Sequence, residues 1–353
     1  MFHGWSCPGK GQPLEWQSFS LKAFQDDDVE IAITHCGICA TDLHVMNSEW
    51  GPTEYPCVAG HEIAGVVTMV GKNVFELKVG DRVGVGAHCD SCRECKECKF
   101  GQENLCRNGT TRTYGSRWRN GDKTYGGFAT KYRGNQHFVF KIPEALSNEI
   151  AATFFCGGIA TFAPLKKYGV TTGSRVGIIG VGGLGHFAIQ WAKAMGAEEV
   201  VVFSTSDKKR ADSEQLGATD YVISDTGYNS DSAQQQVFQE RKGSLSHIIL
   251  CTSFGIQFDW ARYLSLLEAN GVFIMTTAPA ITLDRIPASI VLQRQITIVG
   301  AAVGSPKQIR EMLEFAAEKN VRPWIQKYPM DQIREAIQAL KEGKAKYRFV
   351  LET

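Results

Sequence analysis

The chain has 353 residues, of which 43% are hydrophobic and 21% are charged, a balance typical of a globular protein and not of a disordered one. Its 38 basic and 37 acidic side chains give a formal net charge of +1, so we expect no general attraction to nucleic acid or to an anionic membrane. The unusual feature is cysteine. The chain has 11 cysteines, and five of them lie between Cys89 and Cys106.

The start of the chain does not have the pattern of a signal peptide, because Gly4, Pro8 and Gly9 interrupt its apolar residues. No run of about 18 apolar residues predicts a membrane-spanning helix. We therefore expect a cytoplasmic protein, in which cysteines are metal ligands or free thiols and not disulfides.

Short apolar runs broken by glycine and aspartate predict that the first 150 residues or so are rich in β-strands. The expected strands there are 29–34, 63–70 and 82–85. Tight turns are expected at 71–73 and 79–81.

From about residue 175 the pattern changes to six short, continuously apolar strands separated mostly by helical patterns, at 175–179, 200–203, 221–223, 247–251, 272–275 and 296–299. This alternation predicts a parallel sheet with helices on both faces. Helices are then expected at 307–319 and 330–342, and a final strand at 347–351. The α/β block is thus predicted to be inserted between the β-rich part and a C-terminal return.

The first strand of this block runs directly into Gly180-Val181-Gly182-Gly183-Leu184-Gly185. Apolar residues then recur at helical spacing, at Leu184, Phe187, Ala188, Trp191, Ala192 and Met195. A GxGxxG sequence between a strand and a helix binds the pyrophosphate of a dinucleotide, because glycine allows close approach to the helix N-terminus.

The end of the second strand predicts the choice of cofactor. An NAD enzyme has an acidic residue about 20 residues after the last glycine, but Ser204 stands there, 204 − 185 = 19 residues after Gly185. The hydroxyls and cations of residues 204–210 would bind a 2′-phosphate, so NADP is favoured over NAD. Asp207 competes as a ribose-binding acid, but we interpret it as a helix cap.

Cys92, Cys95, Cys98 and Cys106 have the spacing C-x2-C-x2-C-x7-C, which predicts a closed tetrahedral Zn²⁺ site. The spacing matches neither common ferredoxin pattern, and the near-neutral chain argues against a zinc module that binds nucleic acid. Cys89, upstream of the four, is expected to be a packed thiol.

Cys39, His61 and Cys156 are far apart in sequence. Two cysteines and one histidine are the ligands of an open, catalytic zinc site, although each alone is more often a buried thiol or a core histidine.

With these motifs the chain resembles the zinc-dependent medium-chain alcohol dehydrogenases, and within them the NADP-dependent cinnamyl-alcohol-dehydrogenase branch. The resemblance covers nearly the whole chain and rests on segments 36–44, 59–66, 125–128, 155–158, 180–186, 203–209 and 347–349 and on the four spaced cysteines. It implies a GroES-like catalytic domain, residues 1–157 and 301–353, and a Rossmann NADP-binding domain, residues 158–300. It also implies a homodimer.

The resemblance assigns a catalytic zinc to Cys39, His61 and Cys156 and a structural zinc to the other four cysteines. Asp42 would orient His61, Glu62 would approach the metal, and Thr41 and His44 would carry a proton to the substrate oxygen while NADPH delivers hydride. NADP(H) would be bound by residues of the glycine loop and the following strands, namely Gly180, Gly182, Gly183, Leu184, Gly185, Ser204, Thr205, Ser206, Lys209 and Thr252. Trp50, His88, Tyr114 and Trp118 would lie near an aromatic, cinnamyl or medium aliphatic aldehyde or its primary alcohol.

Three departures from the family pattern concern the substrate. Ala40 replaces a cationic residue near the cofactor phosphates, Ala160 stands where threonine is common, and residues 301–303 are small. They leave open a specialised biosynthetic reductase of a bulky carbonyl or iminium.

An NAD-dependent alcohol dehydrogenase also remains open, as does a zinc-module binding protein with a non-catalytic Rossmann scaffold. Cys156 argues against the polyol dehydrogenases, which usually have a carboxylate as third ligand, and the four spaced cysteines exclude the zinc-free quinone reductases. We expect a small-molecule substrate and no nucleic-acid or membrane partner.

Overall fold

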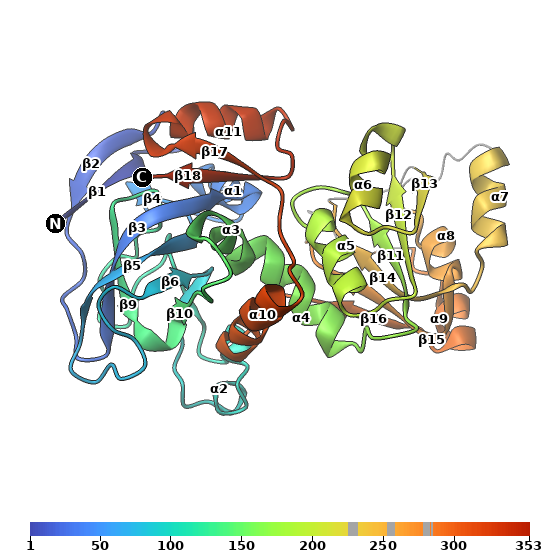
Figure 1. Ribbon diagram of the computed structural model, residues 1–353, viewed down its shortest axis with the longest axis horizontal. Helices are drawn as coiled ribbons and strands as arrows, with labels where there is room; N and C mark the ends of the chain where they lie inside the picture. The colour runs from blue at the N-terminus through green and yellow to red at the C-terminus, as the bar shows by residue number, and fades with distance from the viewer. Residues whose placement is uncertain (225–231, 253–257, 278–282, 284) are drawn as a thin grey trace. The chain divides into compact units, whose positions relative to one another are not determined.

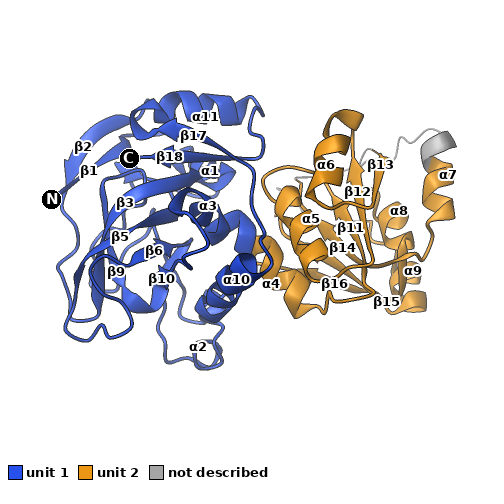
Figure 2. Cartoon of the chain, in the orientation of Figure 1, with its two compact units in different colours: residues 1–159, 303–353 blue, residues 160–302 orange. Residues whose placement is uncertain are grey.

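The computed structural model describes residues 1–224, 232–252, 258–277, 283 and 285–353 (Figure 1). The chain forms two compact units, residues 1–159 with 303–353 and residues 160–302 (Figure 2). The second unit is therefore an insertion in the sequence of the first. Among the described residues, no helix is long and apolar enough to cross a bilayer.

The first unit is built on a mixed seven-stranded sheet. Its order is β10-β6-β5-β3-β18-β17, and β9 also pairs with β3. The strands are β3 (Asp28–Ile38), β5 (Glu62–Val70), β6 (Arg82–Val85), β9 (Lys131–Asn135), β10 (Phe140–Lys141), β17 (Ile325–Pro329) and β18 (Arg348–Glu352). The three early strands and the final strand predicted from the sequence are thus confirmed, and the register of the sheet positions the site described below.

Smaller elements complete this unit. A three-stranded sheet joins β2 (Glu15–Phe19), β1 (Phe2–Cys7) and β4 (Cys57–Val58), and a hairpin-like pair joins β7 (His88–Asp90) to β8 (Thr111–Arg112). The helices are α1 (Ala40–Met46), α2 (Lys96–Lys99), α3 (Asn148–Thr153), α10 (Pro306–Glu318) and α11 (Ile333–Lys341). The last two lie within the helical ranges predicted after residue 302, except for the first residue of α10.

The central strands of this unit pair antiparallel, and one register position matters for the site. Gly37 of β3 is opposite Glu62 of β5. A Cβ atom at Gly37 would lie 2.1 Å from Glu62 Oε2, closer than any van der Waals contact. Glycine at this position therefore leaves room for a buried carboxylate.

The second unit contains a six-stranded parallel sheet of order β13-β12-β11-β14-β15-β16. The strands are β11 (Arg175–Ile179), β12 (Glu199–Ser204), β13 (Asp220–Ile223), β14 (Leu245–Leu250), β15 (Leu267–Met275) and β16 (Thr297–Gly300). All six predicted strands are confirmed. The order reverses between β11 and β14, and ligands of such sheets bind at the carboxyl ends beside that reversal.

Continuous burial explains the apolar strands of this sheet. Val200, Val201 and Val202 are all fully buried, as expected when helices cover both faces. α5 (Gly185–Ala194) packs against β11 and β12, and α8 (Trp260–Ser265) and α9 (Ala288–Arg294) pack against β15. The remaining helices are α4 (Ile159–Lys167), α6 (Arg210–Leu216) and α7 (Ser232–Glu240).

Candidate active site

The three dispersed candidate ligands come together in the first unit. Cys39 precedes α1 at the end of β3, His61 precedes β5, and Cys156 lies in a π-helical turn after α3. The ligand atoms of these residues and of Glu62 all lie within 4.8 Å of one another. Cys39 and Cys156, which are 117 positions apart in sequence, thus meet at one point, and no local sequence pattern predicts this contact.

The donor set fits a zinc ion. The Sγ atoms of Cys39 and Cys156 are 3.8 Å apart, and two sulfurs at about 2.3 Å from a tetrahedral zinc are also about 3.8 Å apart. The Cys156 thiol donates to Cys39 and lowers the pKa of that residue well below its usual value, against the opposing effect of burial. A thiolate is the form of cysteine that binds metal.

Asp42 holds this site together through three hydrogen bonds. Its Oδ1 accepts from the Gly60 amide at 3.1 Å and lies 2.9 Å from His61 Nδ1. Its Oδ2 accepts from the Cys39 amide at 2.9 Å. Because Nδ1 of His61 is engaged, Nε2 is the nitrogen left for a metal, and one carboxylate orients two of the candidate ligands.

The four closely spaced cysteines form a second cluster around α2. The Sγ atom of Cys92 lies 3.9 Å from that of Cys98 and 3.5 Å from that of Cys106, and the Sγ atoms of Cys95 and Cys106 are 4.0 Å apart. These separations also fit a tetrahedral zinc. Cys89 lies outside the cluster: it is fully buried, and its thiol donates to the Arg112 carbonyl.

The glycine loop of the second unit has the geometry that a dinucleotide site requires. Gly180 has φ +89°, and a Cβ there would lie 2.6 Å from Thr252 Cβ. A Cβ at Gly185 would lie 2.0 Å from the Gly180 carbonyl oxygen. The loop enters α5, with the Gly182 carbonyl accepting from the His186 amide at 3.1 Å. Leu184 is the residue before the helix, and Gly183 is half-buried.

Residues after β12 lie beside this loop. Lys209 Nζ donates to the Val181 carbonyl of the loop, so its cation is held at the candidate phosphate site. Ser204 ends β12 and is half-buried, Thr205 is exposed, and the Ser206 carbonyl accepts from Tyr221 at 2.6 Å.

The interpretation of Asp207 as a helix cap is wrong. A short 3-10 helical turn spans Asp207–Lys209, and its N-terminal capping position is Ser206. Asp207 therefore lies inside the turn, and its carboxylate accepts from Arg210 Nε at 2.6 Å. Arg210 lies three residues after Asp207, within reach of the short carboxylate side chain.

Comparisons with known proteins agree with this geometry. Residues 25–144 match the alcohol dehydrogenase GroES-like domain, and residues 183–318 match the zinc-binding dehydrogenase family. Cinnamyl alcohol dehydrogenase 2 of Rauvolfia serpentina is 38% identical over 350 residues, which cover 99% of this chain and 94% of that protein. The chain belongs to the zinc-binding alcohol dehydrogenase family.

Solved structures of this family have the same fold. A cinnamyl alcohol dehydrogenase from Sorghum bicolor superposes with a TM-score of 0.91 at 37% identity, covering 99% of this chain and 97% of that one. A cinnamyl alcohol dehydrogenase from Helicobacter pylori, solved with NADP(H), gives a TM-score of 0.88 at 31% identity, with coverage of 99% and 97%. The two-part fold predicted from the sequence is therefore confirmed.

The predicted relay residues of this dehydrogenase lie on α1. Thr41 is half-buried two residues after Cys39. His44 Nδ1 lies 2.5 Å from Glu49 Oε2, and its ring stacks on Trp50 at 4.7 Å between centroids. Trp50 itself is 58% exposed. Glu49 was not predicted from the sequence. It lies five residues after His44, beyond the end of α1 at Met46.

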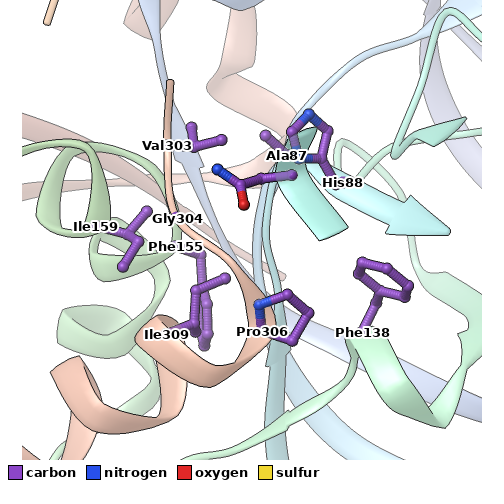
Figure 3. Close-up of a pocket in the computed structure, with 10 residues that line it drawn as sticks. Ala87, His88, Phe138, Phe155, Ile159, Val303, Gly304, Pro306 and Ile309 are labelled. Carbon is purple, nitrogen blue, oxygen red and sulfur yellow. The ribbon is translucent and has the colours of Figure 1, made fainter. Parts of the chain in front are cut away.

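The four predicted pocket residues have different surroundings. Trp50 stacks on His44, whereas the Tyr114 ring packs 5.9 Å from that of His61. Trp118 is buried in the hydrophobic core beneath Lys22 Nζ, 5.0 Å from the ring centroid. His88, the fourth residue, lines a small pocket (Figure 3). Its other walls include Phe155, Ile159, Val303 and Ile309.

The most important residue that the sequence analysis missed is Arg348. It is 6% exposed and forms an ion pair with Glu62, which is fully buried. Burial raises the pKa of Glu62 to about 7, although the arginine opposes that shift. An arginine in the otherwise apolar strand 347–351 was the available signal, since charged residues are rarely buried without a partner.

Proposed function

We propose that this protein is an NADP(H)-dependent zinc alcohol dehydrogenase that interconverts an aromatic, cinnamyl or medium aliphatic aldehyde and its primary alcohol. The observation that carries the proposal is the convergence of Cys39, His61 and Cys156 with Glu62 within 4.8 Å. A metal site with three strong protein ligands and room for a fourth is catalytic in type, and the second unit supplies a dinucleotide fold.

A zinc ion bound at this site would act as a Lewis acid on the substrate oxygen, and a bound nicotinamide would supply or accept the hydride. The chain itself contributes orientation. Asp42 fixes His61 and the Cys39 amide, so the ligands are held in place before any metal binds. Arg348 holds the Glu62 carboxylate beside them.

Proton movement is proposed to run along α1. Thr41 is placed near the start of this helix beside Cys39, and His44 follows one turn later. The Glu49 carboxylate lies 2.5 Å from His44 Nδ1 and orients the imidazole ring. This arrangement suits a histidine that exchanges a proton between substrate and water, because its side chain is partly exposed.

NADPH is proposed over NADH because Ser204 stands where an NAD enzyme has an acid, and the residues after it offer hydroxyls and the Lys209 cation. Burial lowers the pKa of Lys209, and an anionic phosphate beside it would oppose that shift. The remaining proposed contacts are Gly180, Gly182, Gly183, Leu184, Gly185, Thr205, Ser206 and Thr252. Because Ala40 carries no charge, the cations after β12 matter more for holding the phosphates.

The aldehyde is proposed to contact Trp50 and Tyr114, the two predicted aromatic residues whose rings pack on His44 and His61. Flat aromatic walls suit benzylic and cinnamyl groups. The contacts of His88 and Trp118 with the substrate stay predictions, because neither ring packs on His44 or His61.

A second zinc is proposed at Cys92, Cys95, Cys98 and Cys106, where it would fix the loop around α2. Two zincs per chain distinguish this enzyme from a zinc-module binding protein that uses the Rossmann fold only as a scaffold, for which one is expected. Elemental analysis of the purified protein measures the number of zinc ions per chain.

A cytoplasmic location and a homodimer are also proposed. All 11 cysteines lie among the described residues, and none of them is in a disulfide, as expected in a reducing compartment. β16 ends the strand order of the parallel sheet, and Leu292 of the adjacent α9 is 75% exposed, so this edge is suited to pairing with a second copy. Cell fractionation tests the location, and sedimentation velocity tests the homodimer.

The enzymatic proposal is tested by measuring aldehyde reduction with each cofactor. Cinnamaldehyde and a medium aliphatic aldehyde are assayed with NADPH and with NADH in parallel. We expect turnover of cinnamaldehyde and a higher kcat/KM for NADPH. Faster reduction with NADH would refute the cofactor assignment. Reduction only of a bulky cyclic carbonyl or iminium would point to the specialised reductase.

A further inference from the structure

Two cysteines outside both candidate zinc sites lie opposite each other on neighbouring strands. Cys7, the last residue of β1, and Cys57, the first residue of β4, are direct partners in an antiparallel pairing. Such partners have Cα atoms about 4.5–5.5 Å apart and side chains on the same face. A disulfide needs a Cα separation of about 4.4–6.8 Å, so the backbone already allows the bond.

Both thiols are inert while the strands stay closed. Cys7 is 3% exposed and Cys57 is 1% exposed, within one hydrophobic cluster. Burial raises the pKa of both, that of Cys57 to about 12. The Cys7 thiol donates to the Gly9 carbonyl at 3.1 Å. At neutral pH the two residues are therefore protonated and shielded.

Cys7 is nevertheless next to an exposed turn. Residues 10–13, which follow it closely, are all exposed, and β4 has only two residues. Short strands at the end of a small sheet open with less free energy than the core. A local opening at this end would expose Cys7 to small solutes without unfolding the unit.

We propose that Cys7 and Cys57 form a reversible disulfide when the protein meets hydrogen peroxide. The Cys7 thiolate attacks one peroxide oxygen, the O–O bond breaks, and Cys7 becomes a sulfenic acid. The departing hydroxide takes up a proton to give water. Cys57 then attacks this sulfur, the S–O bond breaks, and a second water leaves. The two thiols lose two electrons and two protons, one peroxide becomes two waters, and a dithiol reverses the change.

The bond would join segments that support the candidate active site. Cys57 precedes His61 by four residues, and Cys7 Sγ lies 3.9 Å from the carbonyl of Met46, the last residue of α1. The loop closed by the disulfide contains Cys39. The disulfide would restrain residues 7–57 of the unfolded chain, so the oxidised protein should unfold at a higher temperature.

The test uses the full-length, zinc-loaded protein. It is treated with dilute hydrogen peroxide, remaining thiols are alkylated, and unreduced peptides are mapped by mass spectrometry. We expect a cross-linked peptide pair containing Cys7 and Cys57, two hydrogens lighter than the separate peptides and lost on treatment with dithiothreitol. The melting temperature should rise with the cross-link and return on reduction, while the zinc content of the same sample stays constant.

Two variants serve as controls. Cys251→Ser removes a buried cysteine of the other unit and should leave the cross-link unchanged. Cys57→Ser should abolish it and leave a sulfenic acid at Cys7 that dimedone traps. The peptide map of the unmutated protein decides the question even if a variant fails to fold. Recovery of Cys7 and Cys57 as alkylated thiols would overturn the proposal, and so would a cross-link that forms only after zinc is lost.

Discussion

Arg348 and Glu62 form an ion pair that is almost completely shielded from water, although 286 residues separate them in the sequence. The pair exists because β18 lies antiparallel to β3, and β3 in turn pairs with β5, which begins at Glu62. Removing two charges from water costs several kcal/mol per ion before their attraction is counted. We interpret the pair as a device that holds a carboxylate at the candidate zinc site.

Breaking this pair should destabilise the protein. Arg348→Met leaves an uncompensated buried carboxylate, so we expect a loss of about 3–5 kcal/mol in the free energy of unfolding. Urea denaturation measures it. The double variant Arg348→Met with Glu62→Gln should recover most of the loss, whereas Lys344→Met, which breaks an exposed pair with Glu342, should change little. A double variant as unstable as the single one would contradict this interpretation.

The cysteine cluster around α2 should hold one zinc independently of the other site. Cys98→Ser removes one of four thiolates, and we expect the zinc content to fall from two ions per chain to one. Inductively coupled plasma mass spectrometry measures the ratio. Cys89→Ser is the matched control, because this buried cysteine lies three residues outside the cluster. Equal zinc loss in both variants would count against the assignment.

Reversing the charge at Lys209 should weaken NADPH binding. A charge-assisted hydrogen bond is worth about 1.5–3 kcal/mol, so Lys209→Glu should raise the KM for NADPH by about 10- to 100-fold. The KM for NADH should change much less. Lys208→Glu alters an exposed neighbour with the same charge and should have a small effect. Similar KM values for NADPH in the two variants would disprove the role of Lys209.

The parts of the fold that depend on local patterns were predictable from the sequence. The strand 175–179, the glycine loop and α5 follow one another within 20 residues, so periodicity and glycine spacing were sufficient. The four spaced cysteines were recognisable for the same reason. The two-part architecture followed from the order of such segments and from the family resemblance.

The contacts that depend on sheet register were not predictable. The pairing of Arg348 with Glu62 and the position of Cys7 opposite Cys57 arise only when distant strands align. Glu49 was missed because its contact with His44 follows the end of a helix, where side-chain spacing is no longer regular. Asp207 was misassigned because its neighbour Arg210 offered a partner that a capping rule does not consider.

The imidazole of His88, which is only partly exposed, should make stability depend on pH. Burial lowers its pKa from 6.5 to about 4, so between these values the unfolded chain binds a proton that the folded protein does not. Stability therefore falls as pH decreases through this window, by at most about 3 kcal/mol from this group. His88→Gln should show a smaller fall than the unmutated protein, and His3→Gln, at an exposed site, should show the same fall. Urea titrations at pH 7 and 4 compare them; equal losses in all three proteins would rule the effect out.

The central claim is that Cys39, His61 and Cys156 form the metal site at which an aldehyde is reduced. The most direct measurement is kcat/KM for cinnamaldehyde with NADPH in the unmutated protein and in Cys156→Ala, with circular dichroism to establish that both are folded. We predict a decrease of about 1000-fold or more in Cys156→Ala, because a Lewis acid supplies several kcal/mol of charge stabilisation. A folded Cys156→Ala protein with unchanged kcat/KM would contradict it.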